Sequence, residues 1–489
     1  MTVTVVTFIL CVAVFTLVGI ASSLKKGDTT DDYLIADRSV SPWLAALSSV
    51  ATNNSGFMFV GLIGYTFRDG LHTVWMALAW LLGDLVAWLW VHQRVRETSE
   101  RADVSSVPAL LGTLGGRVQR PIIVVAGIMT FLFLGGYAAA QLNAGATALH
   151  SLFGWEHWVG AVGGAVIVVA YCYSGGIRAS IWTDAVQSFV MLGSMALLLV
   201  YAGLEVGGPS ALLAALRDID PGLVQLFPES MSLGFPLYFL GFVAGGLGAV
   251  GQPHILVRTM AMDSPRSIPR ARGVYFAWFI PFYLGAIAVA LYARVLLPEL
   301  AVAPAGLTGE AASSAVVTAS EAALPELGQA LLPDVFVGLL LAGLFSATMS
   351  TADSQILACS AAVTQDVAPS LRRSTRAAKA ATLGVTALAL VIALSAGQGV
   401  FALVLGAWSF LGAALGPLLV VRVFRIPTPT WLGLSMMASG ALTVLLWGYT
   451  PWAGGVFKLL PGMVVPGLLF ALWALFRPRA SGTLSPTRG

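Results

Sequence analysis

Apolar segments of about 20 residues follow one another along almost the whole chain, and this is the length an α-helix needs to cross a bilayer. Short polar loops separate them. The predicted spans lie at residues 3–23, 42–66, 72–92, 121–149, 158–174, 181–203, 234–250, 273–296, 333–360, 380–397, 400–421, 430–448 and 457–476. The pattern predicts an all-α polytopic membrane protein with about 13 transmembrane helices rather than a barrel.

The basic residues fall on alternate loops between these spans, which predicts the orientation of the chain. Of the 26 Lys and Arg residues, 22 lie in segments that share one side of the membrane, Arg258 among them. The four on the other side are Arg68, Arg217, Arg294 and Lys458. Since basic loops stay in the cytoplasm, we expect a plasma (inner) membrane protein with its N-terminus outside and its C-terminus inside.

The composition also indicates a membrane protein, with 57% hydrophobic residues, 10% charged residues and a mean hydropathy of +0.86. Soluble proteins have about 25% charged residues. The net charge of +3 does not indicate nucleic acid, and no loop is long enough for a cytosolic enzyme or kinase domain. We expect one transmembrane domain in the lipid bilayer over 1–479 and a disordered cytoplasmic tail at 480–489. Cys11, Cys172 and Cys359 lack metal-ligand spacing and are interpreted as buried hydrophobes.

The second span contains a stretch that an α-helix tolerates poorly. Residues 48–66 read SSVATNNSGFMFVGLIGYT. The side chains of Asn53, Asn54 and Ser55 compete for backbone hydrogen bonds, and the glycine that follows costs about 1 kcal/mol relative to alanine. In lipid, broken backbone is tolerated only where it lines a cavity or a bound ion inside the protein. The stretch indicates either a transporter site or a kinked helix whose Asn and Ser face neighbouring helices.

A similar interruption begins the second half of the chain, where the segment FVAGGLGAVGQPH has four glycines before Pro253. Spans two to six and seven to eleven form two sets of five, at about 42–203 and 234–421. Because five is odd, the second set starts from the opposite side of the membrane. Broken helices in corresponding positions of inverted repeats are typical of transporters. The alternative for the glycines is close helix packing.

The ninth span carries hydroxyl side chains at helical spacing. In SATMSTADSQ, Ser350 and Thr351 follow Ala347 by about one turn, so carbonyl and hydroxyl oxygens converge on one face. Hard cations such as Na⁺ prefer oxygen ligands, and carbonyls freed near Ala51 and Asn54 would complete such a site. The alternative is that each hydroxyl bonds the preceding turn of its own helix.

Three carboxylates fall within apolar spans, where acids are costly and usually functional. Asp184 and Asp353 lie near the inner ends of their spans, and Asp84 lies deeper, in LLGDLVAW. A position at the membrane surface is the alternative for Asp184. No histidine has a partner acid at catalytic spacing, and the sequence contains no nucleophile elbow, HExxH motif or phosphate loop. We therefore do not expect an enzyme.

Four segments together resemble the sodium:solute symporter family, most closely its bacterial sodium/proline branch. They are DYLIADR, GGIRASIWTDAVQ, GQPHILVRTMAMDS and SATMSTADSQILACS. The resemblance runs from about Asp32 to Ala474 and is most specific in GQPHILVR. It implies the inverted-repeat fold of LeuT-type transporters, with thirteen spans, a ten-helix core and alternating access driven by Na⁺.

The resemblance also implies the ion sites, residue by residue. The family's sodium site falls on the carbonyls of Ala51, Asn54 and Ala347 and on the hydroxyls of Ser350 and Thr351. Asp184 matches an acid near the inner sodium exit, which in some members shares a second cation site with serines of the ninth span. Those positions are Asp353 and Ser354 in this chain.

The predicted solute site departs from the proline branch. That branch has an aspartate at Asn53, a tryptophan at Phe57 and aromatics at Gly245 and Ala249, whereas Tyr137 is shared. The resulting pocket is expected to be wider and contains no Arg or Lys, which favours a neutral or zwitterionic solute and leaves proline open. The predicted solute-binding residues are Asn53, Ser55, Gly56, Phe57, Tyr137, Gln141, Gly245 and Ala249.

The leading hypothesis is a monomeric Na⁺-coupled symporter that imports a small, amino-acid-like solute by alternating access, with no cofactor besides Na⁺. One alternative is a transporter-like sensor that acts with a separate signalling partner. Another is coupling to H⁺, with Asp184 and Asp353 sharing one proton. A related hypothesis is that Asp353 compensates for the acid missing at Asn53.

Overall fold

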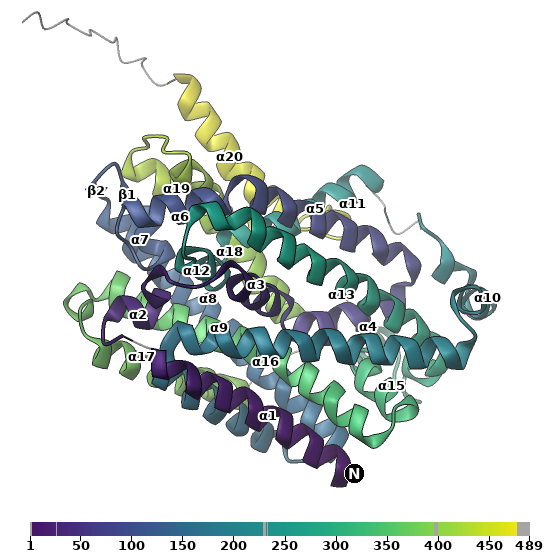
Figure 1. Ribbon diagram of the computed structural model, residues 1–489. Coiled ribbons are helices and arrows are strands. Elements are labelled where there is room, and N and C mark those ends of the chain that lie inside the picture. Colours follow the sequence, from purple (N-terminus) through teal and green to yellow (C-terminus); the bar gives the residue numbers. More distant parts are fainter. Residues whose placement is uncertain (1, 26, 228–230, 232, 396–399, 477–489) are drawn as a thin grey trace, which may run out of the picture.

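The computed structural model describes residues 2–25, 27–227, 231, 233–395 and 400–476, most of them helical (Figure 1). The long helices are α1 Thr2–Ser22, α3 Pro42–Gly56, α5 Val74–Trp90, α8 Arg120–Phe153, α9 His157–Val206, α11 Phe235–Leu247, α13 Ile268–Leu296, α16 Asp334–Ala361, α17 Thr375–Ser395, α18 Val400–Val423, α19 Thr430–Trp447 and α20 Leu459–Phe476. The shorter ones are α2 Thr30–Ile35, α4 Leu62–Asp69, α6 His92–Arg101, α7 Val107–Gly112, α10 Pro209–Ile219, α12 Pro253–Ala261, α14 Gly309–Glu321 and α15 Ala323–Leu331. The predicted helical class is confirmed. A small antiparallel hairpin of β1 Thr113–Leu114 and β2 Arg117–Val118 was not expected.

In the described part of the chain, 10 helices are long and apolar enough to cross a membrane, or 11 if the bent pair Phe235–Gly251 and Pro253–Ala261 is one span. The predicted number of thirteen is not confirmed. Two regions account for the difference. The predicted span 42–66 is divided among short elements, and α9 runs through 50 residues where the sequence predicts two spans. A straight helix of that length would measure about 75 Å, far more than the thickness of a bilayer.

The long helix α9 is interrupted at Gly176, whose backbone is not helical (φ 57°, ψ −141°). A Cβ at this position would lie 2.3 Å from the carbonyl oxygen of Tyr33 in α2. The positive φ and the close approach both require glycine. The break falls between the predicted spans 158–174 and 181–203, so α9 consists of two helical segments joined at this residue.

Replacing Gly176 by alanine is expected to destabilise the fold by about 1–3 kcal/mol, because alanine is strained at positive φ and its Cβ meets the Tyr33 carbonyl. The matched control is Gly193→Ala in the same helix, where a Cβ meets nothing within 4 Å and alanine is the better helix former. Thermal unfolding in detergent measures both variants. Equal unfolding temperatures would contradict the expectation.

Both predicted interruptions of the core helices are confirmed. α3 breaks at Ser55 (φ 43°, ψ 180°), and a π-helical turn, η3 Phe57–Gly61, leads on into α4. In the second half, the 3₁₀ turn η6 Gly248–Gly251 follows α11, and α12 leaves at an angle of 57°. Gln252 between them is extended (φ −102°, ψ 100°), because the residue before a proline avoids the helical region.

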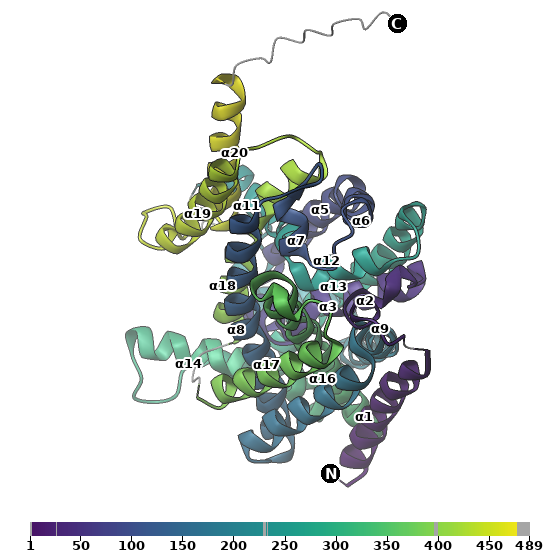
Figure 2. The same cartoon turned by 90° about the vertical axis from the view of Figure 1, so that its left-hand side faces the viewer.

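α16 is the most deeply buried of the described spanning helices. It packs against α1, α3, α8 and α9, while α3 also packs against α13 and α9, and α5 packs against α11. α1 and α20 lie at opposite ends of the bundle (Figures 1 and 2). The broken helix α3 is therefore held against the most buried of these helices.

An ion pair and several hydrogen bonds bring two of the sequence motifs named above together. Arg178, from GGIRAS, forms an ion pair of 2.5 Å with Asp32 of DYLIADR. Arg38 of the same motif donates to the carbonyls of Ser99 and Val104, each at 3.0 Å. These contacts link α2, α6 and the second segment of α9.

Other expectations have mixed outcomes. Cys172 and Cys359 are buried as predicted, whereas Cys11 is half-buried. The predicted tail at 480–489 lies outside the described residues. The domain limits, 1–479 with repeats at 42–203 and 234–421, stay predictions.

Candidate functional site

The break in α3 brings backbone groups into contact with neighbouring helices. The Gly56 N–H donates to Oε1 of Gln141 on α8 at 2.9 Å. In an unbroken helix this N–H would bond the Thr52 carbonyl. Tyr137, also on α8, donates its hydroxyl to Ser55 Oγ at 3.4 Å. The deformed turn is thus stabilised by two side chains that the sequence predicts to bind solute.

Five oxygen atoms from α3 and α16 meet at this break. Thr351 Oγ1 lies 3.0 Å from the carbonyl oxygens of Thr52 and Ala347. Ser350 Oγ lies 3.3 Å from the carbonyl oxygens of Ala51 and Ala347. All five residues are at most 1% exposed. Three carbonyls and two hydroxyls form a donor set of the kind that hard cations prefer.

Asn54 differs from the other four residues predicted for the sodium site. Its carbonyl accepts from the N–H of Phe57, and its side chain donates to the Val50 carbonyl at 2.6 Å. Thr52 supplies the third carbonyl of the cluster, which the sequence did not predict. The signal was available, because a break at Ser55 frees the carbonyls three and four positions before it.

A buried arginine lies beside this oxygen cluster. Arg258 on α12 is 0% exposed, and its guanidinium lies 3.2 Å from Asp184 Oδ2 on α9 and 3.9 Å from Asp353 Oδ1 on α16. Ser48 of α3 joins the pair, since it donates to Asp184 at 2.6 Å and accepts from Arg258 Nε at 3.0 Å. Arg258 is therefore a fixed cation between two buried carboxylates.

Hydroxyl groups surround the Asp353 carboxylate. Tyr171 donates to Oδ2 at 2.7 Å, and Ser180 and Ser354 donate to Oδ1 at 2.9 and 2.8 Å. Ser354 also lies 2.5 Å from the Ser350 carbonyl. The acid thus borders the oxygen cluster, where its spacing along the helix predicts it to lie.

Arg258 is not a loop residue exposed to water, because it is fully buried and contacts Asp184 and Ser354. It lies among Asp184, Asp353 and Ser354, and the second cation site expected at these residues stays a prediction. A membrane-surface position for Asp184 is wrong, because this side chain is 0% exposed. In the structure a tethered guanidinium balances these acids.

Asn53 contacts a different acid from the one proposed to compensate for it. Its Nδ2 lies 2.5 Å from the Tyr275 hydroxyl and 3.4 Å from Asp84 Oδ2. Tyr275 donates to the same carboxylate oxygen at 2.6 Å. Asp353 contacts Arg258 instead. Asp84 in α5 is therefore the acid beside Asn53. The sequence did not predict this contact, because the two residues are 31 positions apart.

An aromatic side chain fills the space beside Gly245, and the expectation that the solute pocket is wider than in the proline branch stays a prediction. A Cβ on Gly245 would lie 2.8 Å from the ring of Trp80, so this indole fills the space that a larger side chain would take. Trp80 also stacks on Phe57 with ring centroids 6.4 Å apart. Trp408 donates from its indole to the Gly245 carbonyl at 2.9 Å, and Ala249 is 1% exposed. Aromatic residues from α5 and α18 thus line the space beside Gly245.

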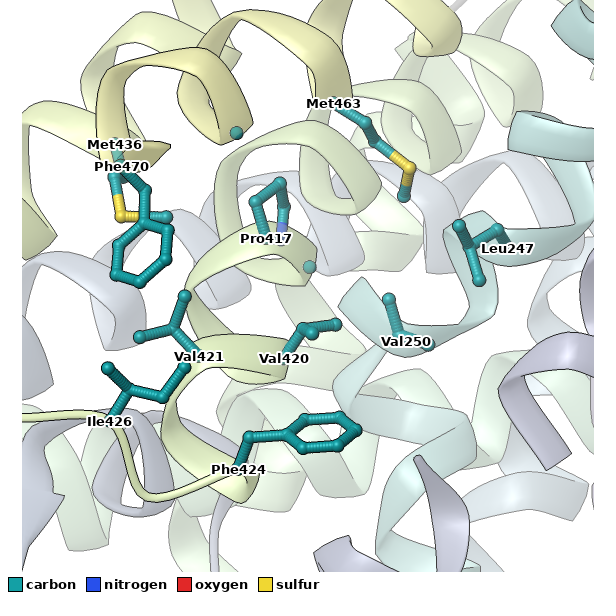
Figure 3. Close-up of a pocket in the computed structure, with 12 residues that line it drawn as sticks. Leu247, Val250, Pro417, Val420, Val421, Phe424, Ile426, Met436, Met463 and Phe470 are labelled. Atoms are coloured by element: carbon teal, nitrogen blue, oxygen red, sulfur yellow. The ribbon is translucent and has the colours of Figure 1, made fainter. Parts of the chain in front are cut away.

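Figure 3 shows a separate pocket of about 360 Å³ between η6, α18, α19 and α20. Its lining residues are Leu247, Val250, Gly416, Pro417, Val420, Val421, Phe424, Ile426, Met436, Met463, Gly467 and Phe470. None of these side chains is polar, so the pocket lacks the hydrogen-bonding groups that orient a polar solute. The polar groups gather at the α3 break instead.

Comparison with known proteins agrees with this architecture. Residues 33–448 match the profile of the sodium:solute symporter family. The high-affinity proline transporter PutP of Bacillus subtilis is 29% identical over 446 residues, covering 90% of this chain and 91% of that protein. The sodium/proline symporter of Escherichia coli is 29% identical over 483 residues, covering 97% and 93%.

Solved structures share the fold. A Na⁺-coupled sialic acid symporter in a substrate-bound outward-open state matches with a TM-score of 0.77 and 19% identity, over 97% of this chain and 98% of that one. Mhp1, a nucleobase-cation-symport-1 family transporter, matches with a TM-score of 0.55 and 15% identity, over 92% and 96%.

The architecture is the LeuT-type inverted-repeat fold of multi-pass membrane transporters, as predicted. The chain belongs to the sodium:solute symporter family.

Proposed function

We propose that this protein is a Na⁺-coupled symporter that imports a small neutral or zwitterionic solute. The observation that carries the proposal is the cluster of three carbonyl and two hydroxyl oxygens between α3 and α16. It lies where a membrane helix is broken and buried against another, the arrangement that transporters use for coupling ions. Na⁺ would bind Ala51, Thr52, Ala347, Ser350 and Thr351, and Asn54 would join only if its carbonyl turned.

Two unpartnered polar atoms favour a solute with both a donor and an acceptor. Asn53 Oδ1 and Gln141 Nε2 are buried without a hydrogen-bond partner among the described residues. A buried polar atom without a partner is costly, so a ligand that satisfies both gains affinity. An ammonium group suits the amide oxygen, and a carboxylate suits the amide N–H. The solute would lie among Asn53, Ser55, Gly56, Phe57, Tyr137, Gln141, Gly245 and Ala249.

Topology and assembly follow from the same proposal. Basic loops would face the cytoplasm, with the N-terminus outside and the C-terminus inside. We also propose that the transporting unit is a monomer. Alternating access would require α12 and its Arg258 to separate from α9 and α16 when the inner side opens.

A thermal-shift screen in detergent tests the proposal. Na⁺ is expected to raise the unfolding temperature, whereas K⁺ is not. A bound solute at about 100 times its Kd is expected to raise the free energy of unfolding by about 2.7 kcal/mol. The panel compares L-proline and other neutral amino acids with dicarboxylates, which the pocket should not bind because it contains no cationic side chain. Equal unfolding temperatures in Na⁺ and K⁺ would contradict the proposal.

A further inference from the structure

Asp84 is a buried carboxylate that lacks the cationic partner its surroundings would require. It is 1% exposed on α5, and its Oδ2 accepts hydrogen bonds from Tyr275 at 2.6 Å and from Asn53 at 3.4 Å. None of the ion pairs between described residues includes it. Of the other buried acids, Asp184 and Asp353 face Arg258, and Asp32 pairs with Arg178. Asp366, in a turn just after the ninth predicted span, is buried as well and accepts from Ser106 at 2.6 Å.

The backbone of α5 at Asp84 packs directly against α11, while the carboxylate contacts α13 and α3. A Cβ on Gly83 would lie 1.9 Å from the Val243 carbonyl oxygen, and a Cβ on Gly246 would lie 1.9 Å from the Trp80 carbonyl oxygen and 2.8 Å from the Asp84 nitrogen. The backbones of α5 and α11 are therefore in direct contact at this level. An ionised carboxylate enclosed in this way is strongly disfavoured unless a cation binds it.

The titratable and charged groups on the neighbouring elements point elsewhere, apart from Tyr275 on α13. His92, at the start of α6, stacks on Trp88 and bonds Thr259 at 2.7 Å. On η4 (Leu71–Thr73), His72 packs on Tyr238 of α11. Arg272 of α13 lines an apolar pocket with Leu82 and Leu85. The helix α3, which contributes the neutral Asn53, and the turn η6 contain no charged residue.

The hydrogen bonds at Asp84 favour a proton over a metal ion. Asn53 donates to the Tyr275 hydroxyl, which donates to the Asp84 carboxylate, so the three side chains contact one another directly and not through an ion. A Na⁺ ion needs several oxygen ligands around it, whereas here an amide N–H points at the carboxylate. A proton needs no additional space.

We propose that Asp84 is a proton-binding site, and that one proton from water converts its carboxylate to the neutral acid in this conformation. Tyr275 keeps its own proton and donates to Asp84. Because Asn53 lies in the broken helix α3, loss of the Asp84 proton would disturb the proposed solute site. That consequence for transport rests on the proposed function, but proton binding itself does not.

Infrared difference spectroscopy of the full-length protein in detergent, between about pH 5 and about pH 9, tests the proposal. The wild type is expected to show a carbonyl-stretch band of a protonated carboxyl group that is lost in Asp84→Asn, shifted in Asp84→Glu and retained in Asp353→Asn. A full band in Asp84→Asn would overturn the assignment.

Measurements in Na⁺ and in K⁺ distinguish a proton site at Asp84 from a Na⁺ site. A proton site predicts that the Asp84 band persists when Na⁺ replaces K⁺ and that Asp84→Asn keeps the Na⁺-induced rise in unfolding temperature. If Na⁺ abolishes the band and Asp84→Asn lacks the Na⁺ effect, Asp84 binds Na⁺ and the proposal is wrong. The wild-type thermal shift in Na⁺ tests the symporter proposal separately, so the two can fail independently.

Discussion

Replacing Thr351 by alanine is expected to raise the Na⁺ concentration for half-maximal solute uptake by about tenfold to a hundredfold. The hydroxyl would be one of five oxygen ligands, since it lies 3.0 Å from the Thr52 and Ala347 carbonyls. A polar group that interacts with a charge contributes about 1.5–3 kcal/mol, which corresponds to that factor. Ser350→Ala removes the second hydroxyl and should act in the same direction.

Two control variants separate the loss of a Na⁺ ligand from a nonspecific effect of the substitution on the structure of α16. Ser346→Ala removes a buried hydroxyl of the same helix that bonds the Ala342 carbonyl at 2.6 Å, outside the oxygen cluster, and should leave Na⁺ activation unchanged. Thr351→Ser keeps the hydroxyl and should stay close to the wild type. If Ser346→Ala and Thr351→Ala shift Na⁺ activation equally, the cluster is not the sodium site.

Replacing Arg258 by methionine is expected to destabilise the folded protein by about 3–5 kcal/mol. The substitution leaves Asp184 and Asp353 without a cation, and because both are 0% exposed, water cannot compensate for the lost charge. Methionine has a similar length, so the effect reports charge rather than a cavity. Thermal unfolding in detergent, at matched Na⁺ concentrations, measures it.

A charge-neutral variant is the control for Arg258. Adding Asp184→Asn and Asp353→Asn to Arg258→Met removes all three charges and should recover most of the lost stability, because replacing a whole buried ion network is often nearly neutral. Na⁺ should stabilise Arg258→Met more than the wild type, since two acids are left for a cation. Wild-type stability of Arg258→Met, or no recovery in the triple variant, would contradict this account.

The sequence predicted the features that depend on local chemistry. The helix breaks follow from Asn, Ser, Gly and Pro in apolar spans, and both occur, at Ser55 and around Gln252. The spacing of Ser350 and Thr351 predicted that both hydroxyls share a face with the Ala347 carbonyl, as they do. These predictions need only helix geometry, which a single segment contains.

Features that depend on the packing of distant segments were not predictable. Arg258 follows a broken helix, and its burial depends on the 57° bend that turns α12 into the core. The contact between Asn53 and Asp84 joins α3 to α5, and the filling of the space at Gly245 depends on the position of Trp80. A single sequence gives residue types at these positions but not their neighbours in space.

Solute uptake into proteoliposomes under an imposed Na⁺ gradient is the most direct test of the central claim, that Na⁺ bound between α3 and α16 drives import. With a solute that stabilises the protein in the thermal-shift screen, the wild type is expected to accumulate solute when Na⁺ is high outside and not with an equal K⁺ gradient. Thr351→Ala should need about tenfold or more Na⁺ for the same rate. Uptake by the wild type that is equally fast with K⁺ in place of Na⁺ would contradict the claim.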